Sequence, residues 1–568
     1  MKKILIQSCL AVIIFSLTAF AQKPAGNDIA DVLDEYLTRM AGFGFSGAVI
    51  VEKEGKFILR KGYGYSNREK HILFTPDTPY PVQSIAKQFT AASILKLEEQ
   101  GKLSLNDPIE KYFKDVPDDK RSITIHQLLT HTSGFTADYS GANIFDQDKA
   151  VKAILKNPLG NPIGKVMSYN NDGYELLAAI VRIVSGQDLA DFIRRDLFLP
   201  AGMKTAGFQG DGDLWEDGAV AHGYNSYVDN GSPQYTKPDW DGRGSTDIIA
   251  SANDLFKWEL SLRNEDVLSA GIKEKMFTPY VDFIPDWQYG YGWFVIRSKR
   301  GTTEYYHGGG DTPGGYTASY TRYPAEKMTI IIFTNTMIDE LGFLRAVKDD
   351  ITDIAFGKSI QMPPAFTDPE NAKLQKFTGI YKAGSGEEFV VKLLDGQLMI
   401  GALNQPSIDL LTTPDKDTKA KIKEYSNLTS QYLRKIANDK TGELLLRSDL
   451  KDLKRRYGNL INHKLLGTYP VSEDRGLLTT YAKLNFEKGD EVVRFVRSRD
   501  NDPYPLLGNP YPAFTPIKPQ KGNGFVAYYP FLKKSVEIKF DLDSSQNAVS
   551  INVKNSVRTL SATKVRHN

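Results

Sequence analysis

The chain has 568 residues, with 71 lysine or arginine side chains against 69 aspartate or glutamate side chains. This balance gives no indication of the excess positive charge typical of nucleic-acid binding, so we expect no nucleic-acid partner. The length predicts more than one domain.

The N-terminal segment has the pattern of a cleaved secretory signal. The chain opens with MKK, continues with a long apolar run and reaches the small-residue sequence AFA just before Gln22. We therefore predict a signal peptide over residues 1–21 and an exported protein, periplasmic or secreted. A lipoprotein signal is the alternative because Ser8 precedes Cys9, but few apolar residues come before that cysteine.

Cleavage of this segment would also remove Lys2, Lys3 and Cys9. The remaining chain has 69 basic and 69 acidic side chains and no cysteine. A disulfide, a thiol nucleophile and a thiolate metal site are then excluded, so stability must come from the core. No later apolar run is long enough to span a bilayer, and we expect no transmembrane segment in the mature chain.

A change in composition divides the chain. Mixed α/β patterns extend through GFLRAVKDDITDIAFGK (342–358), and SIQMPPAFTDPE (359–370) then brings three prolines close together. We expect a linker here, between a first domain over 22–360 and a second region over 361–568. In the second region apolar residues alternate at period two, as in VEIKFDLD (536–543), which predicts mainly β structure.

Two local features stand out in the second region. Asp395-Gly396 is a good two-residue hairpin turn between two alternating runs. Residues 418–439 instead have a helical pattern, which either packs on the same sheet or separates two β subdomains. No catalytic pattern occurs in this region, so we expect an accessory role in cleft access, oligomer contact or substrate selection.

A serine and a lysine three residues apart begin a helical stretch in the first domain. Residues 84–100 are mostly apolar and end at Gly101, which predicts a largely buried helix. Ser84 stands at its start, where an amide N–H has no intrahelical partner and can stabilise an oxyanion. Lys87 lies on the same face, and burial would make its ammonium costly unless it is paired or functional.

Spacing alone does not identify the nucleophile. Ser93 and Lys96 repeat it, but a serine in mid-helix bonds back to the backbone, so we predict a structural role for Ser93. The spacing recurs at Ser448 and Ser561, about as often as chance allows. The alternative for Lys87 itself is a solvated surface lysine.

Two further segments complete a constellation with Ser84 and Lys87. Tyr169-Asn170-Asn171 lies in a loop before an amphipathic helix, and His307-Gly308-Gly309-Gly310 lies on a strand followed by a turn and a second strand. With these motifs in this order, and with flanks such as SITIHQLLTHTSGF, the chain resembles the serine hydrolases related to class C β-lactamases, penicillin-binding DD-peptidases, D-aminopeptidases and esterases. The resemblance covers roughly residues 28–357.

The resemblance implies a fold and a set of site residues. The fold is the α/β (α+β) β-lactamase-like transpeptidase fold, an antiparallel sheet with flanking helices, here followed by a mainly β portion of barrel-like, lipocalin-like form. The implied catalytic residues are Ser84, Lys87 and Tyr169, and the implied substrate-binding or oxyanion residues are Asn171, His307, Gly309 and Gly310. Ser84 would attack a carbonyl, and Lys87 or Tyr169 would take its proton. Neither a cofactor nor a metal is implied.

The remaining roles follow from the same resemblance. Asn171 would hold Lys87 or the substrate amide by hydrogen bonds, and the N–H groups of Ser84 and Gly310 would form the oxyanion hole. The partner is then a small-molecule or short peptide substrate. The sequence leaves the oligomeric state open.

His307 occupies the position where β-lactamases usually have lysine. With an unperturbed pKa of ~6.5 it would be mostly neutral at pH 7, so we expect a weak grip on a substrate carboxylate that strengthens on acidification. This favours D-amino-acid amides, short peptides cut from the amino end, or short-chain esters. The alternatives are a DD-carboxypeptidase, a β-lactamase, and a catalytically silent protein that binds peptide or cell-wall fragments.

One further motif match and one departure from the pattern of the relatives remain. Lys440-Thr441-Gly442 reproduces the third motif of β-lactamases, but Tyr425-Ser426-Asn427 and Ser448 crowd around it in the wrong order, and we interpret the match as coincidence. Relatives usually carry a run of glycines where this chain has Gly244-Ser245-Thr246-Asp247. The carboxylate of Asp247 lies either near the cleft or at the surface.

The histidines and aromatic residues give no further site. The seven histidines form no metal-spaced pair, so we predict no zinc. Structural roles are expected for His126, His131 and His222. The stretch 211–244 either lines the cleft or forms a plain surface loop, and its candidate cleft residues are Trp215, Tyr224 and Trp240.

Overall fold

The computed structural model describes most of the chain after the N-terminal segment. The described residues are 28–136, 140–225, 227–311, 314–337, 342–367, 374–394, 396–438, 448–472, 477–497, 503–506, 513–520 and 524–565. The predicted signal segment, Asp395 of the predicted hairpin turn, and the Lys440-Thr441-Gly442 match lie outside them. Among the described residues no helix combines the length and apolarity needed to cross a membrane.

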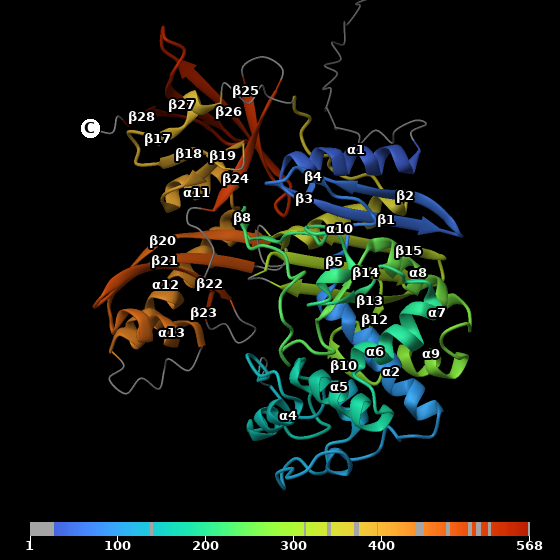
Figure 1. Ribbon diagram of the computed structural model, residues 1–568. Helices are drawn as coiled ribbons and strands as arrows, with labels where there is room; N and C mark the ends of the chain where they lie inside the picture. Colours follow the sequence, from blue (N-terminus) through green and yellow to red (C-terminus); the bar gives the residue numbers. More distant parts are fainter. Residues whose placement is uncertain are drawn as a thin grey trace, which may run out of the picture.

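The first domain is built on an eight-stranded sheet in the order β10-β11-β12-β13-β14-β15-β1-β2, with every neighbouring pair antiparallel (Figure 1). Its strands are β1 (Gly47–Lys53), β2 (Lys56–Tyr63), β10 (Val281–Ile284), β11 (Trp287–Tyr289), β12 (Phe294–Arg297), β13 (Thr303–Asp311), β14 (Tyr316–Tyr323) and β15 (Met328–Thr334). Every residue of β14 and β15 is buried, so both faces of the sheet are covered. The predicted antiparallel sheet with flanking helices is confirmed.

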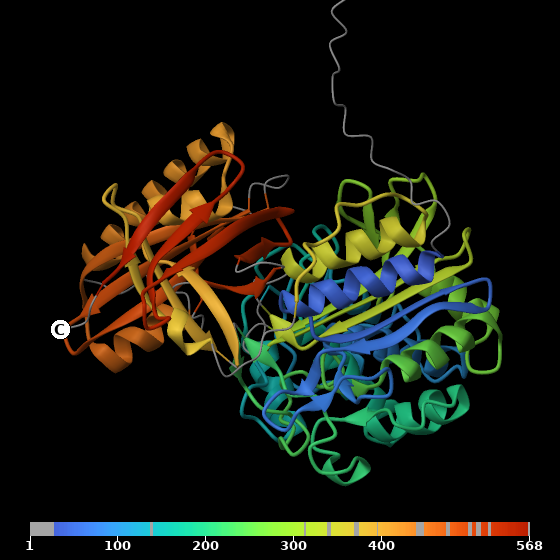
Figure 2. The same ribbon diagram turned by 90° about the horizontal axis from the view of Figure 1, so that it is seen from above.

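Two helices cover one face of the sheet, α1 (Ile29–Gly42) and α10 (Gly342–Ala355), as Figure 2 shows. Their apolar sides form one core with alternate residues of the central strands. The other face carries a larger helical layer. It consists of α2 (Lys87–Glu99), α3 (Ile125–Leu129), α4 (Gln147–Lys156), α5 (Asp172–Ser185), α6 (Leu189–Ile193), α7 (Leu199–Ala201), α8 (Ala252–Arg263) and α9 (Ala270–Phe277).

Helix α2 lies in the middle of this layer and is buried on nearly all sides, as its sequence predicts. Its first turn differs from the expectation. Residues Gln83–Ala86 form the 3₁₀ turn η1, and the α-helix begins only at Lys87. Ser93 makes the predicted backbone bond, donating from Oγ to the carbonyl of Phe89 at 2.8 Å.

Short elements connect these layers. They are β3 (Tyr65–Asn67), β4 (Ile72–Leu73), β5 (Tyr80–Pro81), η2 (Ile109–Lys111), η3 (Arg194–Phe198), β6 (Gly207–Phe208), η4 (Gly212–Leu214), β7 (Tyr224–Asn225), β8 (Val228–Asp229), β9 (Ile248–Ala250) and β16 (Thr336–Met337). Strand β9 pairs with β5 and β6, which ties the segment before η1 to the rest of the domain.

The second region forms two separate β units. A closed barrel contains β17 (Gly379–Lys382), β18 (Glu388–Leu394), β19 (Gln397–Ala402), β24 (Phe514–Pro519), β25 (Gly524–Tyr529), β26 (Lys534–Leu542), β27 (Ala548–Lys554) and β28 (Thr559–Lys564), preceded by η6 (Gln375–Phe377). A four-stranded sheet contains β20 (Leu460–Ser472), β21 (Leu477–Phe486), β22 (Gly489–Arg497) and β23 (Pro503–Leu506). The mainly β character is confirmed.

The helical interruption belongs to the second of these units. Helices α11 (Gln405–Thr412), α12 (Lys416–Asn438) and α13 (Ser448–Tyr457) lie between β19 and β20 in the chain. Leu433 and Ile436 of α12 share a core with Val493 of β22. The predicted helix therefore covers a sheet that is distinct from the barrel.

The barrel packs against the α1 and α10 layer of the first domain. Val526 and Tyr528 of β25 share that layer's core, and the ring centroid of Tyr528 lies 5.5 Å from that of Phe43. The ammonium of Lys533 lies 2.6 Å from the carboxylate of Asp350, a buried residue of α10. This contact is on the opposite side of the sheet from α2.

Candidate active site

Ser84 lies in the 3₁₀ turn η1, and Lys87 follows it as the first residue of α2. The Nζ of Lys87 is 3.2 Å from the Oγ of Ser84 and 2.8 Å from the Oδ1 of Asn171. A third acceptor, the carbonyl of Ser245, lies at 3.2 Å. Lys87 is fully buried, so it is not a solvated surface lysine. Three oxygen acceptors match the three protons of an ammonium group.

Tyr169 lies beside this lysine. The Nζ of Lys87 is 4.9 Å from the centre of the Tyr169 ring, within the range of a cation–π contact. The preceding loop brings Tyr169 to the start of α5, and Asn171 is the N-cap residue of that helix. Asn171 was expected to bind either Lys87 or the substrate amide, and in the structure its side chain accepts a hydrogen bond from Lys87.

His307, the first residue of the third motif, is buried on β13. Its Nδ1 lies 2.7 Å from the carbonyl of Gly308, to which it donates, and its Nε2 lies 3.2 Å from the hydroxyl of Tyr289. Burial, with a smaller contribution from the charge of Lys87, lowers the pKa of His307 to about 3. The expected ordinary pKa is therefore wrong, and so is the expected gain of positive charge on mild acidification, because the ring is removed from water.

Gly309 allows β13 to approach the turn that holds Ser84. A Cβ at this position would lie 2.3 Å from the carbonyl oxygen of Val82 and 2.8 Å from the Cβ of Gln83. Gln83 itself has a φ of +53°, a left-handed conformation that is rare outside glycine. Gly310 follows on the strand and is exposed. Because β13 approaches the turn before Ser84, the expected oxyanion donors, the N–H groups of Ser84 and Gly310, belong to adjoining segments.

The segment Gly244-Ser245-Thr246-Asp247, where relatives usually carry glycines, supplies a hydrogen-bond acceptor to Lys87. The carbonyl of Gly244 accepts a hydrogen bond from Thr90 of α2 at 2.7 Å, and the next carbonyl is the one that binds Lys87. Asp247 accepts from the N–H of Gly244 and lies 3.1 Å from Arg243. The carboxylate is only 3 % exposed and has these partners within its own loop, so it is not on the surface.

Several residues near the site were not identified from the sequence. His131 was assigned a structural role, yet its ring centroid lies 4.4 Å from that of Tyr169. Tyr174 and Tyr289 pack against the same histidine. Their only sequence signal was the position of His131 in LLTHTSGF, a flank of the constellation.

The three candidate cleft residues of 211–244 are buried, whereas Tyr235 of the same stretch is exposed. Trp240 belongs to the main core, and Trp215 packs in a small cluster with Val220 and Ile249. Tyr224 is fully buried, and its hydroxyl donates to Glu69 at 2.7 Å.

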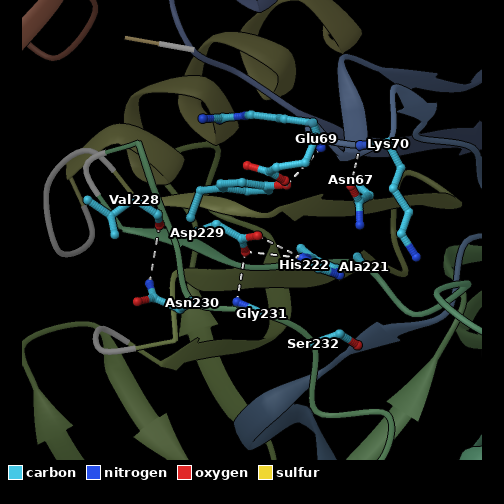
Figure 3. Close-up of polar contacts among 12 residues, drawn as sticks. Asn67, Glu69, Lys70, Ala221, His222, Val228, Asp229, Asn230, Gly231 and Ser232 are labelled. Atoms are coloured by element: carbon cyan, nitrogen blue, oxygen red, sulfur yellow. Dashed lines mark hydrogen bonds and ion pairs between the residues drawn. The ribbon is translucent and has the colours of Figure 1, made fainter.

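One group in the described part of the chain has the composition of a metal site (Figure 3). The ligand atoms of Glu69, His222 and Asp229 lie within 4.8 Å of one another. His222 Nδ1 is 3.1 Å from each oxygen of Asp229, so these two residues already form a pair. The spacing of the histidines did not reveal this group, because it has a single histidine and Glu69 comes from a distant segment of the chain.

The comparisons with known proteins agree with this geometry. Residues 29–350 match the family described as Beta-lactamase. The chain belongs to the Beta-lactamase family.

Two relatives within this family come from Bacillus subtilis (strain 168). PbpX, which is named as a penicillin-binding protein, is 34% identical over 255 residues, and the match covers 44% of this chain and 62% of PbpX. Penicillin-binding protein 4* is 26% identical over 402 residues, covering 66% of this chain and 87% of the relative.

A solved structure extends the likeness to the second region. The octameric penicillin-binding protein homologue from Pyrococcus abyssi superposes with a TM-score of 0.51 at 19% identity, covering 94% of this chain and 98% of that chain. At this identity the likeness shows the fold. The fold of the first domain together with the second region therefore recurs in another protein.

Proposed function

We propose that this member of the Beta-lactamase family is an exported serine hydrolase that forms an acyl-enzyme on Ser84. Its substrates would be small amides or esters, such as D-amino-acid peptides and amides or short-chain esters. The observation that carries the proposal is the contact between the hydroxyl of Ser84 and the buried ammonium of Lys87. A protein that only binds ligands has no need for a buried cation beside a half-exposed serine.

We propose Tyr169 as the base. The Nζ of Lys87 lies within 3.2 Å of three oxygen acceptors, an arrangement that suits an ammonium group. Its positive charge beside the Tyr169 ring would favour a phenolate able to take the Ser84 proton. Ser84 Oγ attacks the substrate carbonyl carbon as its proton passes to Tyr169.

The later steps use the same groups. The N–H groups of Ser84 and Gly310 hold the oxyanion of the tetrahedral intermediate. The Tyr169 hydroxyl returns the proton to the leaving amine or alcohol, which departs as the acyl-enzyme forms. Water then adds to the acyl carbon, and the acid product is released with Ser84 restored.

The charge of the third motif supports the substrate class. His307 stays neutral over the whole working pH range, so the third motif supplies no cation for a substrate carboxylate. Substrates without a charged end should therefore be turned over better than penicillins or D-Ala-terminated peptides. The test compares kcat/KM for nitrocefin, a D-Ala-D-Ala peptide, a D-amino-acid anilide and p-nitrophenyl acetate on one sample. A clear preference for nitrocefin would replace this assignment with a β-lactamase.

The nucleophile is tested separately with a fluorophosphonate probe and intact-mass detection. The wild-type protein should gain one adduct, and Ser84→Ala should gain none. Ser93→Ala is the matched control, because this serine has the same spacing to a lysine but bonds to the helix backbone. Absence of an adduct on the wild type, or equal labelling of Ser84→Ala, would favour the silent binding protein instead.

A further inference from the structure

His131 contacts the loop of Tyr169 at two points. Its carbonyl accepts a hydrogen bond from the N–H of Ser168 at 2.8 Å, and its ring Nδ1 accepts one from the N–H of Asn170 at 3.3 Å. These are the two residues on either side of Tyr169. The single residue His131 therefore fixes the backbone on both sides of the proposed base.

The backbone of His131 makes this double contact possible. It has a φ of +58°, in the left-handed region, two residues after the end of α3. Asparagine, aspartate and histidine enter this region more readily than other side chains. The turn directs the carbonyl and the ring of one residue toward the same neighbouring segment.

The ring must be neutral for this contact. An Nδ1 that accepts a hydrogen bond carries no proton, so the ring proton is on Nε2. Burial, and to a smaller extent the charge of Lys87, lower the pKa of His131 well below its usual value. The acceptor is therefore available at every pH at which the enzyme would work.

The other nitrogen shows that packing alone does not account for a histidine here. His131 is fully buried, and its Nε2 has no hydrogen-bond partner among the described residues. A buried unpaired N–H is unfavourable, and phenylalanine at the same position would avoid this cost. The ring packs at tilted angles against Tyr169, Tyr174 and Tyr289, contacts that phenylalanine would also make.

We infer that His131 is a positioning residue for Tyr169, acting through its two hydrogen bonds to the flanking amides. It holds the phenol in the place where it can exchange a proton with Ser84. The inference rests on the proposed function, because it assumes that Tyr169 takes part in acylation. It predicts that the acceptor atom of residue 131 matters for rate more than the packing of its ring does.

Two substitutions separate these features. His131→Phe keeps the aromatic ring and removes the acceptor. His131→Asn removes the ring, but its Oδ1 occupies about the same place as the histidine Nδ1, and asparagine tolerates a left-handed backbone. The measurements are kcat and KM for p-nitrophenyl acetate, the rate of fluorophosphonate labelling, and the thermal midpoint.

The two variants should affect different quantities: His131→Phe should lower the rate, and His131→Asn should lower the stability. We expect His131→Phe to lower kcat and the labelling rate by about 10- to 100-fold with KM changed little, because a misplaced catalytic group costs this much. His131→Asn should retain the rate within about threefold while lowering the thermal midpoint, since it leaves a cavity. If the rate instead follows stability in both variants, His131 is only structural and the inference is wrong.

A double-mutant cycle with Tyr169→Phe tests whether His131 acts through Tyr169. In that background His131→Phe should cause no further loss, whereas equal losses in both backgrounds would refute the inference. If Tyr169→Phe alone labels at the wild-type rate, the proposed role of Tyr169 fails instead. His126→Phe is the control, because His126 lies on the same segment but bonds to Tyr291 and should leave the rate unchanged.

Discussion

Lys87 and Asn171 are 84 residues apart in the sequence, yet the Nζ of Lys87 donates a hydrogen bond to the Oδ1 of Asn171 at 2.8 Å. This contact joins α2, the helix that follows the nucleophile, to α5, the helix that follows the proposed base. It also supplies an acceptor to an ammonium that is completely removed from water. Loss of the acceptor should therefore affect both stability and chemistry.

The first prediction concerns this contact. Asn171→Leu keeps the volume of the side chain but leaves the Lys87 ammonium with one acceptor fewer. We expect a loss of about 1–3 kcal/mol in the free energy of unfolding and at least a tenfold slower labelling of Ser84. Urea unfolding and the labelling rate measure the two effects. Asn106→Ala, at an exposed position, is the control; an Asn171→Leu protein as active as the wild type would contradict the role of this contact.

The second prediction concerns the approach of β13 to Ser84. Gly309→Ala would place a methyl group 2.3 Å from the backbone carbonyl of Val82, which cannot move without shifting the turn before the nucleophile. We expect labelling of Ser84 to fall by about 100-fold or more. Gly271→Ala is a matched control, because its Cβ would meet only the Oγ of Ser269 at 3.9 Å. Equal labelling of both variants would show that β13 does not need this close approach.

The third prediction concerns the pH dependence of stability. His307 binds a proton in the unfolded chain below its usual pKa but only below about pH 3 in the folded protein. Over that window the unfolded state holds more protons, so the free energy of unfolding falls as the pH falls from about 6.5 toward 3. Each such histidine contributes at most about 1.4 kcal/mol per pH unit.

Urea unfolding at pH 7, 6 and 5 measures this dependence. His307→Gln should unfold with a shallower pH dependence than the wild type, because glutamine does not titrate. His222→Gln is the control, since this histidine is paired with Asp229 near the surface, away from the buried cluster. A dependence as steep in His307→Gln as in the wild type would show that other groups account for it.

The fourth prediction concerns the contact between the barrel and the first domain. Lys533→Ala removes one of the partners of Asp350, a carboxylate that is 3% exposed and also accepts a hydrogen bond from Tyr36. The lysine is 43% exposed, so solvent weakens the pair. We expect a loss of about 1 kcal/mol and an unchanged rate of Ser84 labelling, because the contact is on the far side of the sheet. Lys554→Ala, from an exposed pair with Glu537, should change neither quantity. Slower labelling of Lys533→Ala would instead connect the barrel to the active site.

Local patterns in the sequence determined the elements that carry the chemistry. An apolar stretch ending at Gly101 predicted the buried helix that begins near Ser84, and period-two alternation predicted the β character of the second region. These signals are readable because a helix or a strand buries its own apolar face wherever it packs. The order of the three motifs then indicated the family, and the structure brings Ser84, Lys87, Tyr169 and Asn171 together.

The tertiary structure alone decided what surrounds those residues. The pKa of His307 depends on its removal from water, and the contacts of His131 depend on a left-handed turn that brings it against a loop 39 residues away in the sequence. The group formed by Glu69, His222 and Asp229 likewise exists only because Glu69 meets the distant segment that carries the other two residues. Desolvation and long-range hydrogen bonds are properties of packing between elements, and a one-dimensional pattern contains no record of which elements will be neighbours.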